Sequence, residues 1–156
     1  MNIFALDQIP EKAAQYHVDK HVVKMPLEYA QLLSTAHVII DNKRRGYAAT
    51  HIHHPSAKWA RLNRNTYLWL YELFRHTSRE YHHRYGRHHK SWLELETELE
   101  EPPAGLLDEP FRPPYLAMPA IYMKPGDCVG SYRLYYNEDK RELHSWTNRP
   151  KPEWIT

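Results

Sequence analysis

The chain has 156 residues, with 21 lysines and arginines against 19 aspartates and glutamates, so its formal net charge is only +2. A single cysteine excludes both a disulfide framework and a thiolate zinc site. No apolar run approaches the roughly 20 residues that span a membrane, and the first ten residues are too short and uncharged for a secretory signal. We therefore expect a soluble, cytoplasmic protein that folds as one domain over residues 1–156.

A long helix is predicted after a short apolar lead-in. Residues 13–37 read AAQYHVDKHVVKMPLEYAQLLSTAH, and Pro10 suits the first turn of a helix. Pro26 removes one backbone donor and crowds the preceding turn, so it predicts a kink or a split in this helix. The kink would fall between Lys24 and Glu28.

A narrow polar stripe runs along this helix between two apolar faces. Successive helical residues turn by about 100°, which places the members of the stripe within roughly 40° of one line. The members are His17, His21, Lys24, Glu28, Gln31 and Thr35. Such a stripe is either a solvated face or the floor of a functional site.

Residues 55–85 have the pattern of a second long helix. A proline opens the segment, apolar and aromatic residues follow at spacings of three and four, and a glycine ends it. Residues 58–90 contain eight lysines and arginines (58, 61, 64, 75, 79, 84, 87 and 90) but only Glu72 and Glu80 as acids. This balance favours an anionic partner such as nucleic acid, although a basic helix face is often only solvated. The candidate phosphate contacts on this helix are Arg61, Arg64 and Arg84.

The C-terminal half is predicted to contain a short helix, an extended wrap and a last helix. Ser91 begins a capping box for a helix that ends near Glu101. Residues 102–125 contain seven prolines and no helical period, so we expect an extended wrap whose apolar side chains pack on the helices. Asp127 caps the last helix, which carries two more candidate nucleic-acid contacts, Arg133 and Tyr136. No segment reads as a strand, so the predicted fold class is mainly α, with about four helices and a proline-rich wrap.

Three chemical interpretations of the polar stripe are open. Lys24 and Glu28, one helical turn apart, are either a surface ion pair or an amine and an acid in one pocket. In such a pocket the amine attacks a sugar carbon to form a Schiff base, while the carboxylate manages the proton or the sugar cation. His17 and His21 have the spacing of a two-histidine metal site, whose third ligand would be Glu28 or a histidine of the cluster before the second helix. The third interpretation is a non-enzymatic protein that binds nucleic acid through its basic helix.

Three motifs resemble the pattern of a family of bacteriophage proteins. They are DKHVVKMPLEYAQLLSTA at residues 19–36, HHPSAKWAR at residues 53–61 and YRLYY at residues 132–136. In the order of its elements the chain also resembles, more distantly, the endonuclease V-type pyrimidine-dimer DNA glycosylase superfamily. This resemblance implies a compact all-helical DNA repair enzyme that flips out a base, attacks the deoxyribose carbon with an amine and cleaves the strand by β-elimination.

The chain departs from that superfamily at the residues that perform the chemistry. The phage-encoded glycosylase uses the α-amine left after loss of its initiator methionine, together with a glutamate on the first long helix. Here residue 2 is Asn2, which usually blocks methionine removal, so the exposed amine would be that of Met1. Lys24 stands at the position of the family's glutamate, and Glu28 is the nearest acid on the same stripe.

The leading hypothesis is a base-excision DNA glycosylase and abasic-site lyase, or a related base-processing enzyme, that requires neither a cofactor nor a metal. Its predicted nucleophile is Lys24 or the Met1 amine, with Glu28 as the acid, and His17, His21 and His54 complete the predicted site. DNA is the expected partner, and the oligomeric state is open. The alternatives are a histidine-ligated, metal-dependent phosphodiester or nucleotide hydrolase and a non-enzymatic nucleic-acid-binding phage protein.

Overall fold

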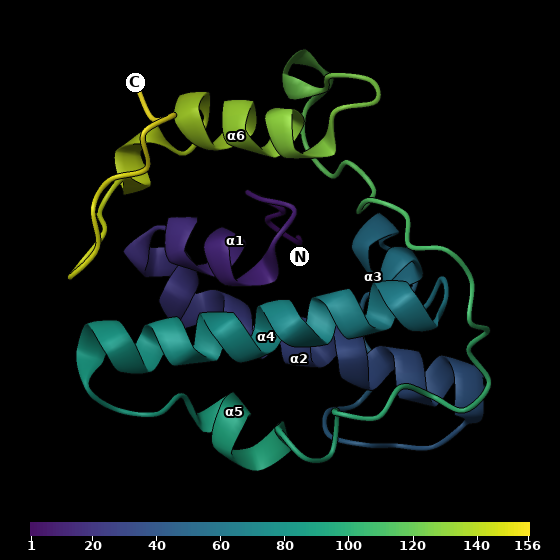
Figure 1. Ribbon diagram of the computed structural model, residues 1–156. Helices are drawn as coiled ribbons and strands as arrows, with labels where there is room; N and C mark the ends of the chain where they lie inside the picture. The colour runs from purple at the N-terminus through teal and green to yellow at the C-terminus, as the bar shows by residue number, and fades with distance from the viewer.

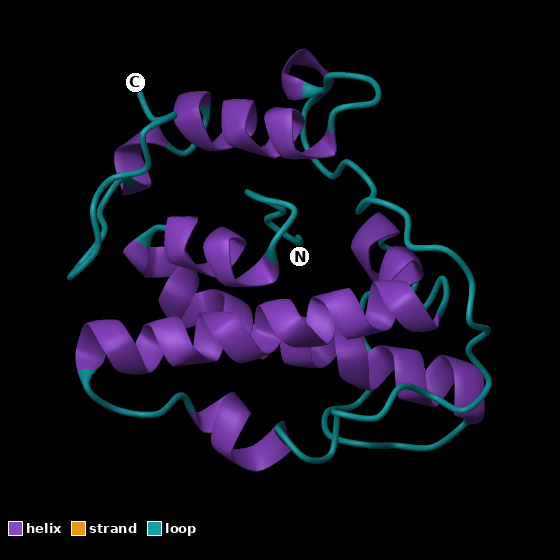
Figure 2. Ribbon diagram, viewed as in Figure 1, coloured by secondary structure: helices purple, strands orange, loops and turns teal.

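Two long antiparallel helices form the centre of the computed structural model, which describes residues 1–156 (Figure 1). The helices are α1 (Pro10–Tyr16), α2 (Asp19–Asp41), α3 (Pro55–Ala60), α4 (Arg64–Tyr85), α5 (Lys90–Leu95) and α6 (Cys128–Glu138), with the 3₁₀ turns η1 (Ala120–Tyr122) and η2 (Arg141–Leu143). The central helices are α2 and α4, and α1 packs on α4. Helices α5 and α6 lie on opposite sides of this layer (Figure 1). No strand is present (Figure 2), which confirms the mainly α class. None of the helices combines the length and apolar character needed to cross a membrane.

The first predicted helix is divided at His17 and Val18, not at Pro26. Both residues have extended backbone, with ψ of 134° and 156° respectively, and α2 then continues through Pro26. Tertiary contacts take up the backbone groups that this break exposes. Arg84 donates to the carbonyl of His17 at 2.8 Å, and the amide of Val18 donates to the hydroxyl of Tyr136 at 3.2 Å. The prediction of one helix kinked at Pro26 is therefore wrong in the position of the break.

The second predicted helix is also two helices, because a capping box lies inside it. The side chain of Asn63 accepts from the amide of Thr66 at 2.9 Å, and the hydroxyl of Thr66 accepts from the amide of Asn63 at 3.2 Å. These reciprocal bonds satisfy donors that the first turn of α4 leaves free. Gly86 ends α4 with a positive φ of 72°, as predicted.

Of the remaining helices, α5 differs from prediction at both of its ends. His89, not Ser91, is the N-cap of α5, since its Nδ1 accepts from the amide of Ser91 at 3.1 Å. The helix ends at Leu95, short of the predicted end near Glu101. Asp127 caps α6 as predicted, by accepting from the amide of Gly130 at 2.8 Å.

The proline-rich wrap follows the surface without helix until η1, as predicted. Backbone carbonyls hold much of it in place, and Trp59 for example donates to the carbonyl of Arg112 at 2.9 Å. The expectation that apolar side chains of the wrap pack on the helices is correct for Leu106. It is wrong for Leu107 and Ile121, which are 67% and 81% exposed.

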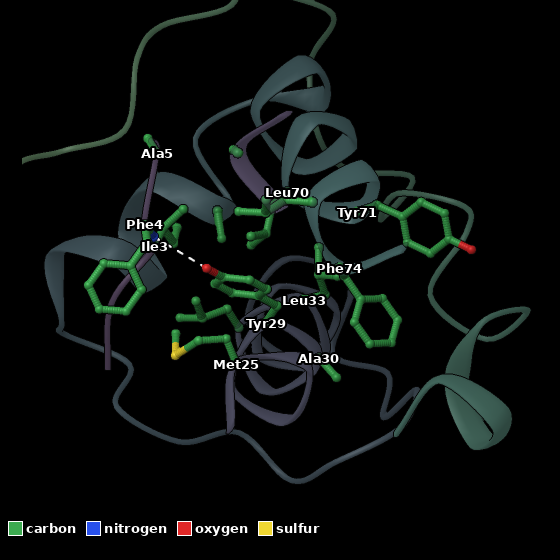
Figure 3. Close-up of a cluster of buried hydrophobic side chains, with 14 of the residues drawn as sticks. Ile3, Phe4, Ala5, Met25, Tyr29, Ala30, Leu33, Leu70, Tyr71 and Phe74 are labelled. Atoms are coloured by element: carbon green, nitrogen blue, oxygen red, sulfur yellow. Dashed lines mark hydrogen bonds between the residues drawn. The ribbon is translucent and has the colours of Figure 1, made fainter. Parts of the chain in front are cut away.

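The N-terminal segment Ile3–Leu6 crosses the interior as irregular chain, and its residues are at most 4% exposed. It lies between α6 and the central helices (Figure 1). Figure 3 shows Ile3 and Phe4 beside the Tyr29 ring of α2, with Leu70 of α4 close by. Burial of these side chains is the main force that holds the segment inside the fold.

The Tyr29 hydroxyl ties this segment to the break between α1 and α2. The Nδ1 of His17 donates to the carbonyl of Ala13 at 2.6 Å, so the Nε2 of the neutral ring accepts from the Tyr29 hydroxyl at 2.7 Å. The Tyr29 oxygen accepts in turn from the amide of Phe4 at 3.3 Å, the dashed line in Figure 3. One hydroxyl thus satisfies a buried ring nitrogen and a buried backbone donor.

We predict that Tyr29→Phe lowers the free energy of unfolding by about 2–4 kcal/mol, because two buried polar groups lose their partner at once. Urea denaturation measures this loss. The control is Tyr115→Phe, whose ring is 40% exposed and whose hydroxyl makes no hydrogen bond within the fold. Equal stability of the two variants would contradict the bridging role.

Candidate active site

A small cavity of about 190 Å³ lies between the N-terminal segment, α2 and the C-terminal end of α6. Three of its lining residues carry amino groups and one carries a carboxylate. The lining residues are Met1, Asn2, Phe4, His21, Lys24, Met25, Glu28, Tyr135 and Lys140. The cavity therefore concentrates the two kinds of group that the sequence placed on the polar stripe.

Two amines meet the single carboxylate of this cavity. The α-amino nitrogen of Met1 lies 3.3 Å from Oε1 of Glu28, and Nζ of Lys24 lies 3.5 Å from Oε2. The side chain of Glu28 is 11% exposed, whereas that of Lys24 is 67% exposed. Oε2 is itself buried and has no hydrogen-bond partner, so the carboxylate is not fully satisfied within the fold.

Asn2 fixes the position of the α-amino group from the side of the wrap and α6. Its amide nitrogen donates to the carbonyl of Ala117 at 2.8 Å, and its side-chain oxygen accepts from the hydroxyl of Tyr132 at 2.9 Å. The Phe4 ring stacks on His21 with centroids 4.3 Å apart. Contacts with the wrap, α6 and His21 therefore hold the first four residues in place, so the α-amine has a fixed position in the cavity.

His21 lines the cavity as a neutral ring. The hydroxyl oxygen of Tyr136 accepts from the amide of Val18, so its own proton is donated to Nδ1 of His21 at 2.6 Å. Burial, with the positive charges of Lys140 and other neighbours, lowers the pKa of His21 to about 3. The neutral ring then carries its hydrogen on Nε2, which has no partner in the protein and is free to donate to a ligand.

The other two predicted histidines do not line the cavity. His17 is fully buried, and both of its ring nitrogens are bonded, as described above. His54 is the N-cap of α3, where its Nδ1 accepts from the amide of Ser56 at 3.0 Å. Burial lowers the pKa of His54, and the positive charge of the Met1 ammonium adds to this effect. His17 is thus a structural residue, and His54 is the cap of α3.

Arg84, predicted to contact phosphate, lies in the interior, and each of its three side-chain nitrogens is already bonded. Its side chain donates to Glu80 at 2.8 Å and Asp19 at 3.0 Å, and to the carbonyls of His17 at 2.8 Å and Gln15 at 3.0 Å. Its side chain has no exposed surface. These bonds account for the Arg84 side chain without a nucleic-acid contact.

Two further predicted contacts on α6 also have structural partners. Tyr136 is fully buried against His21. Arg133 donates to the carbonyl of Leu6 at 2.8 Å and to Asp7 at 3.0 Å, which holds the end of the N-terminal segment. These bonds account for both side chains without a ligand.

The last two predicted arginines lie on α3 and α4. Arg61 is half-buried and donates to the carbonyl of Ile52 at 2.7 Å, and its buried Nη1 has no partner. Arg64 is exposed at the start of α4. Of the five predicted nucleic-acid contacts, Arg64 alone presents an exposed side chain, and it does not line the cavity.

Sequence reasoning did not select Tyr135 and Lys140, although both line the cavity. Nζ of Lys140 lies 4.8 Å from the centroid of the Tyr135 ring, a cation–π contact. The YRLYY motif at residues 132–136 was the available signal for Tyr135, but the neighbouring Tyr136 was chosen from it. No sequence signal links Lys140 to the first helix.

The metal-site hypothesis finds no ligand set in this structure. No group of three or more His, Cys, Asp and Glu side chains is arranged to hold a metal ion. The pair proposed from spacing is also divided by the break at His17, whose two ring nitrogens are both engaged within the fold.

A larger cavity of about 510 Å³, lined by residues such as Trp69 and Phe111, lies elsewhere. Its two carboxylates already have partners, because Asp7 pairs with Arg133 and Asp127 caps α6. It contains no amine beside a free carboxylate oxygen, so we place the candidate active site in the smaller cavity.

Comparisons of the chain with models of protein families, with curated proteins and with solved structures return no match.

We predict that acid destabilises the protein below about pH 6.5. Burial lowers the pKa of His17 to about 4 and that of His21 to about 3, from an ordinary value of 6.5. As the pH falls through this window, the unfolded chain binds protons that the folded chain does not, so stability present above pH 6.5 is lost. Each histidine contributes a slope of about 1 kcal/mol per pH unit.

Urea denaturation at pH 7, 6 and 5 measures this slope. His17→Gln removes one of the two rings whose pKa is lowered furthest and is expected to reduce the slope by about 1 kcal/mol per pH unit. An unchanged slope in this variant would show that the pH dependence has another origin.

Proposed function

We propose that the protein is a DNA glycosylase and abasic-site lyase that uses an amine nucleophile. One observation carries the proposal: the α-amino group of Met1 and the carboxylate of Glu28 face each other at 3.3 Å in a cavity. Schiff-base catalysis requires an amine that can attack a sugar carbon and a neighbouring group that manages protons. The neutral donor of His21 in the same cavity supports a role in hydrogen bonding to the sugar or the departing base.

The geometry favours the α-amine over Lys24 as the nucleophile. The side chain of Met1 is only 3% exposed and that of Lys24 is 67% exposed, so the α-amine is the more rigidly held of the two. The ammonium group of Lys24, beside Glu28 and open to solvent, can attract a phosphate.

The amine and the carboxylate of this cavity are sufficient for both steps of the proposed reaction. The unprotonated amine attacks C1′ of the deoxyribose, the bond from C1′ to the base breaks, and the base leaves with the electron pair and takes up a proton. Opening of the sugar ring gives an imine between C1′ and the α-nitrogen. The carboxylate of Glu28 then removes a proton from C2′, and β-elimination breaks the C3′–O bond with the phosphate as leaving group.

The charge around the cavity suits a DNA backbone. Lys20 and Lys24 are exposed on α2, and Lys140, which pairs with Asp139, lines the cavity. Their ammonium groups can contact phosphates on both sides of a nucleotide whose sugar enters the cavity.

Borohydride trapping tests the proposal. Purified protein is incubated with a DNA duplex that carries an abasic site, and then with duplexes that carry a pyrimidine dimer or a modified pyrimidine. Borohydride reduces the imine, so a covalent protein–DNA adduct is expected. Salt-dependent binding with neither an adduct nor strand cleavage on any of these substrates would instead support a non-enzymatic nucleic-acid-binding protein.

We predict that adduct formation is lost when a Gly-Ser extension is placed before Met1, since the extension moves the amine out of the cavity. Lys24→Ala is expected to keep the adduct with weaker binding to DNA. Peptide mapping of the reduced adduct identifies the modified nitrogen directly. The reverse result, an adduct retained by the extended protein and lost in Lys24→Ala, would assign the nucleophile to Lys24.

We predict that Glu28→Gln slows strand cleavage at an abasic site by about 100-fold or more, because the base for β-elimination is removed. Glutamine keeps the size of the side chain, and a melting curve checks that the fold is retained. Glu94→Gln, at an exposed acid of α5, is the matched control and is expected to leave the rate unchanged. A rate within about twofold of wild type in Glu28→Gln would overturn the role of this carboxylate.

A further inference from the structure

The turn η1 presents a bare apolar tip. Ile121 is 81% exposed, more than any other large apolar side chain of the protein that reaches the surface, and Met123 beside it is 37% exposed. Isolated exposed apolar residues are common. This one lies on a turn whose backbone is fixed, which is less common.

Hydrogen bonds and prolines make the turn rigid. Within it, the amide of Tyr122 donates to the carbonyl of Pro119 at 3.0 Å, and the amide of Met123 donates to the carbonyl of Ala120 at 3.0 Å. Ser131 of α6 then binds the following residue, since its hydroxyl accepts from the amide of Lys124 at 2.8 Å. The turn therefore holds the Ile121 side chain in an exposed position, and no movement of the loop is needed to expose it.

The turn packs on a residue that lines the candidate active site. The ring of Tyr122 packs on that of Tyr135, with centroids 5.4 Å apart. Tyr135 lines the cavity that contains the Met1 amine and Glu28. One aromatic pair thus connects the exposed tip to the place where a sugar would enter.

The charges beside the tip favour a polyanion as the occupant of this surface. Lys124 is exposed directly after Met123, and Lys140 lies over the Tyr135 ring. An apolar tip flanked by ammonium groups matches duplex DNA, where the phosphates surround an apolar stack of bases.

We propose that Ile121 is a wedge that enters the base stack of duplex DNA beside the nucleotide whose sugar occupies the cavity. This inference rests on the proposed function and adds to it the step that takes the nucleotide out of the duplex. An apolar side chain inserted between bases replaces part of the stacking that the displaced base gives up. The wedge acts only on duplex substrates, because a single strand has no continuous stack to open.

The experiment compares duplex and single-stranded DNA, each with one abasic site. Ile121→Ala is expected to lower the rate of borohydride-trapped adduct on the duplex by about tenfold and to leave the rate on the single strand within about twofold. Ile121→Leu keeps the apolar bulk and is expected to retain the duplex rate. Leu93→Ala, at a 63% exposed residue of α5, is the matched control and changes neither rate.

A second measurement reads the wedge without chemistry. The duplex carries a stable abasic analogue with 2-aminopurine as the adjacent base, whose fluorescence rises when it loses its stacking partner. Saturating wild-type protein is expected to raise the fluorescence, and saturating Ile121→Ala protein to leave it near the level of free DNA. A rise of equal size with both proteins, or no rise with wild type, would overturn the wedge.

The two proposals fail in different ways. If wild-type protein forms no adduct even on single-stranded DNA, the proposed function fails, and the fluorescence measurement still decides whether Ile121 enters a duplex. If adducts form but Ile121→Ala has the wild-type ratio of duplex to single-strand rates, the lyase chemistry stands and the wedge is wrong.

Discussion

The Tyr29 hydroxyl is the contact on which the arrangement of the site depends. It accepts from the Phe4 amide and donates to His17, so it connects an irregular segment with no helical bonds of its own to two helices. Without this contact the amide of Phe4, three residues after Met1, would be a buried donor with no partner. Tyr132 of α6 binds Asn2 as well. Together these contacts fix the position of the first residues, so that the α-amine lies beside Glu28.

A second buried polar cluster fixes the orientation of α2. Arg84 binds Glu80, Asp19 and the carbonyl at the break before α2. Arg149, in the C-terminal tail, adds three further bonds to Glu80. Buried charges of this kind contribute more to a unique arrangement than to stability, because their desolvation offsets much of the attraction. The start of α2, and hence the direction in which Lys24 and Glu28 project, is set by this cluster.

Local signals in the sequence predicted the helical class, the end of α4 at Gly86, the cap at Asp127 and the pairing of Lys24 with Glu28. They did not predict which basic and aromatic residues are buried. Arg84 looks like an exposed basic residue until Asp19 and Glu80 are brought to it by packing, and Tyr136 differs from Tyr135 only by the rotation of α6 against the N-terminal segment. His17 was placed on one stripe with His21 because the helical period was assumed to continue through the break. Such choices depend on tertiary packing, which periodicity alone does not contain.

The pairing of Asn2 with Tyr132 has a consequence for how the protein is made. Residues 2 and 132 are joined directly, and Asp19 is bonded to Thr147 near the other end of the chain. A ribosome synthesises the N-terminal residues first, and domains fold largely as units. The contact between Asn2 and Tyr132 can therefore form only after residue 132 has emerged, late in synthesis. It joins distant residues, which is the kind of contact that slows folding.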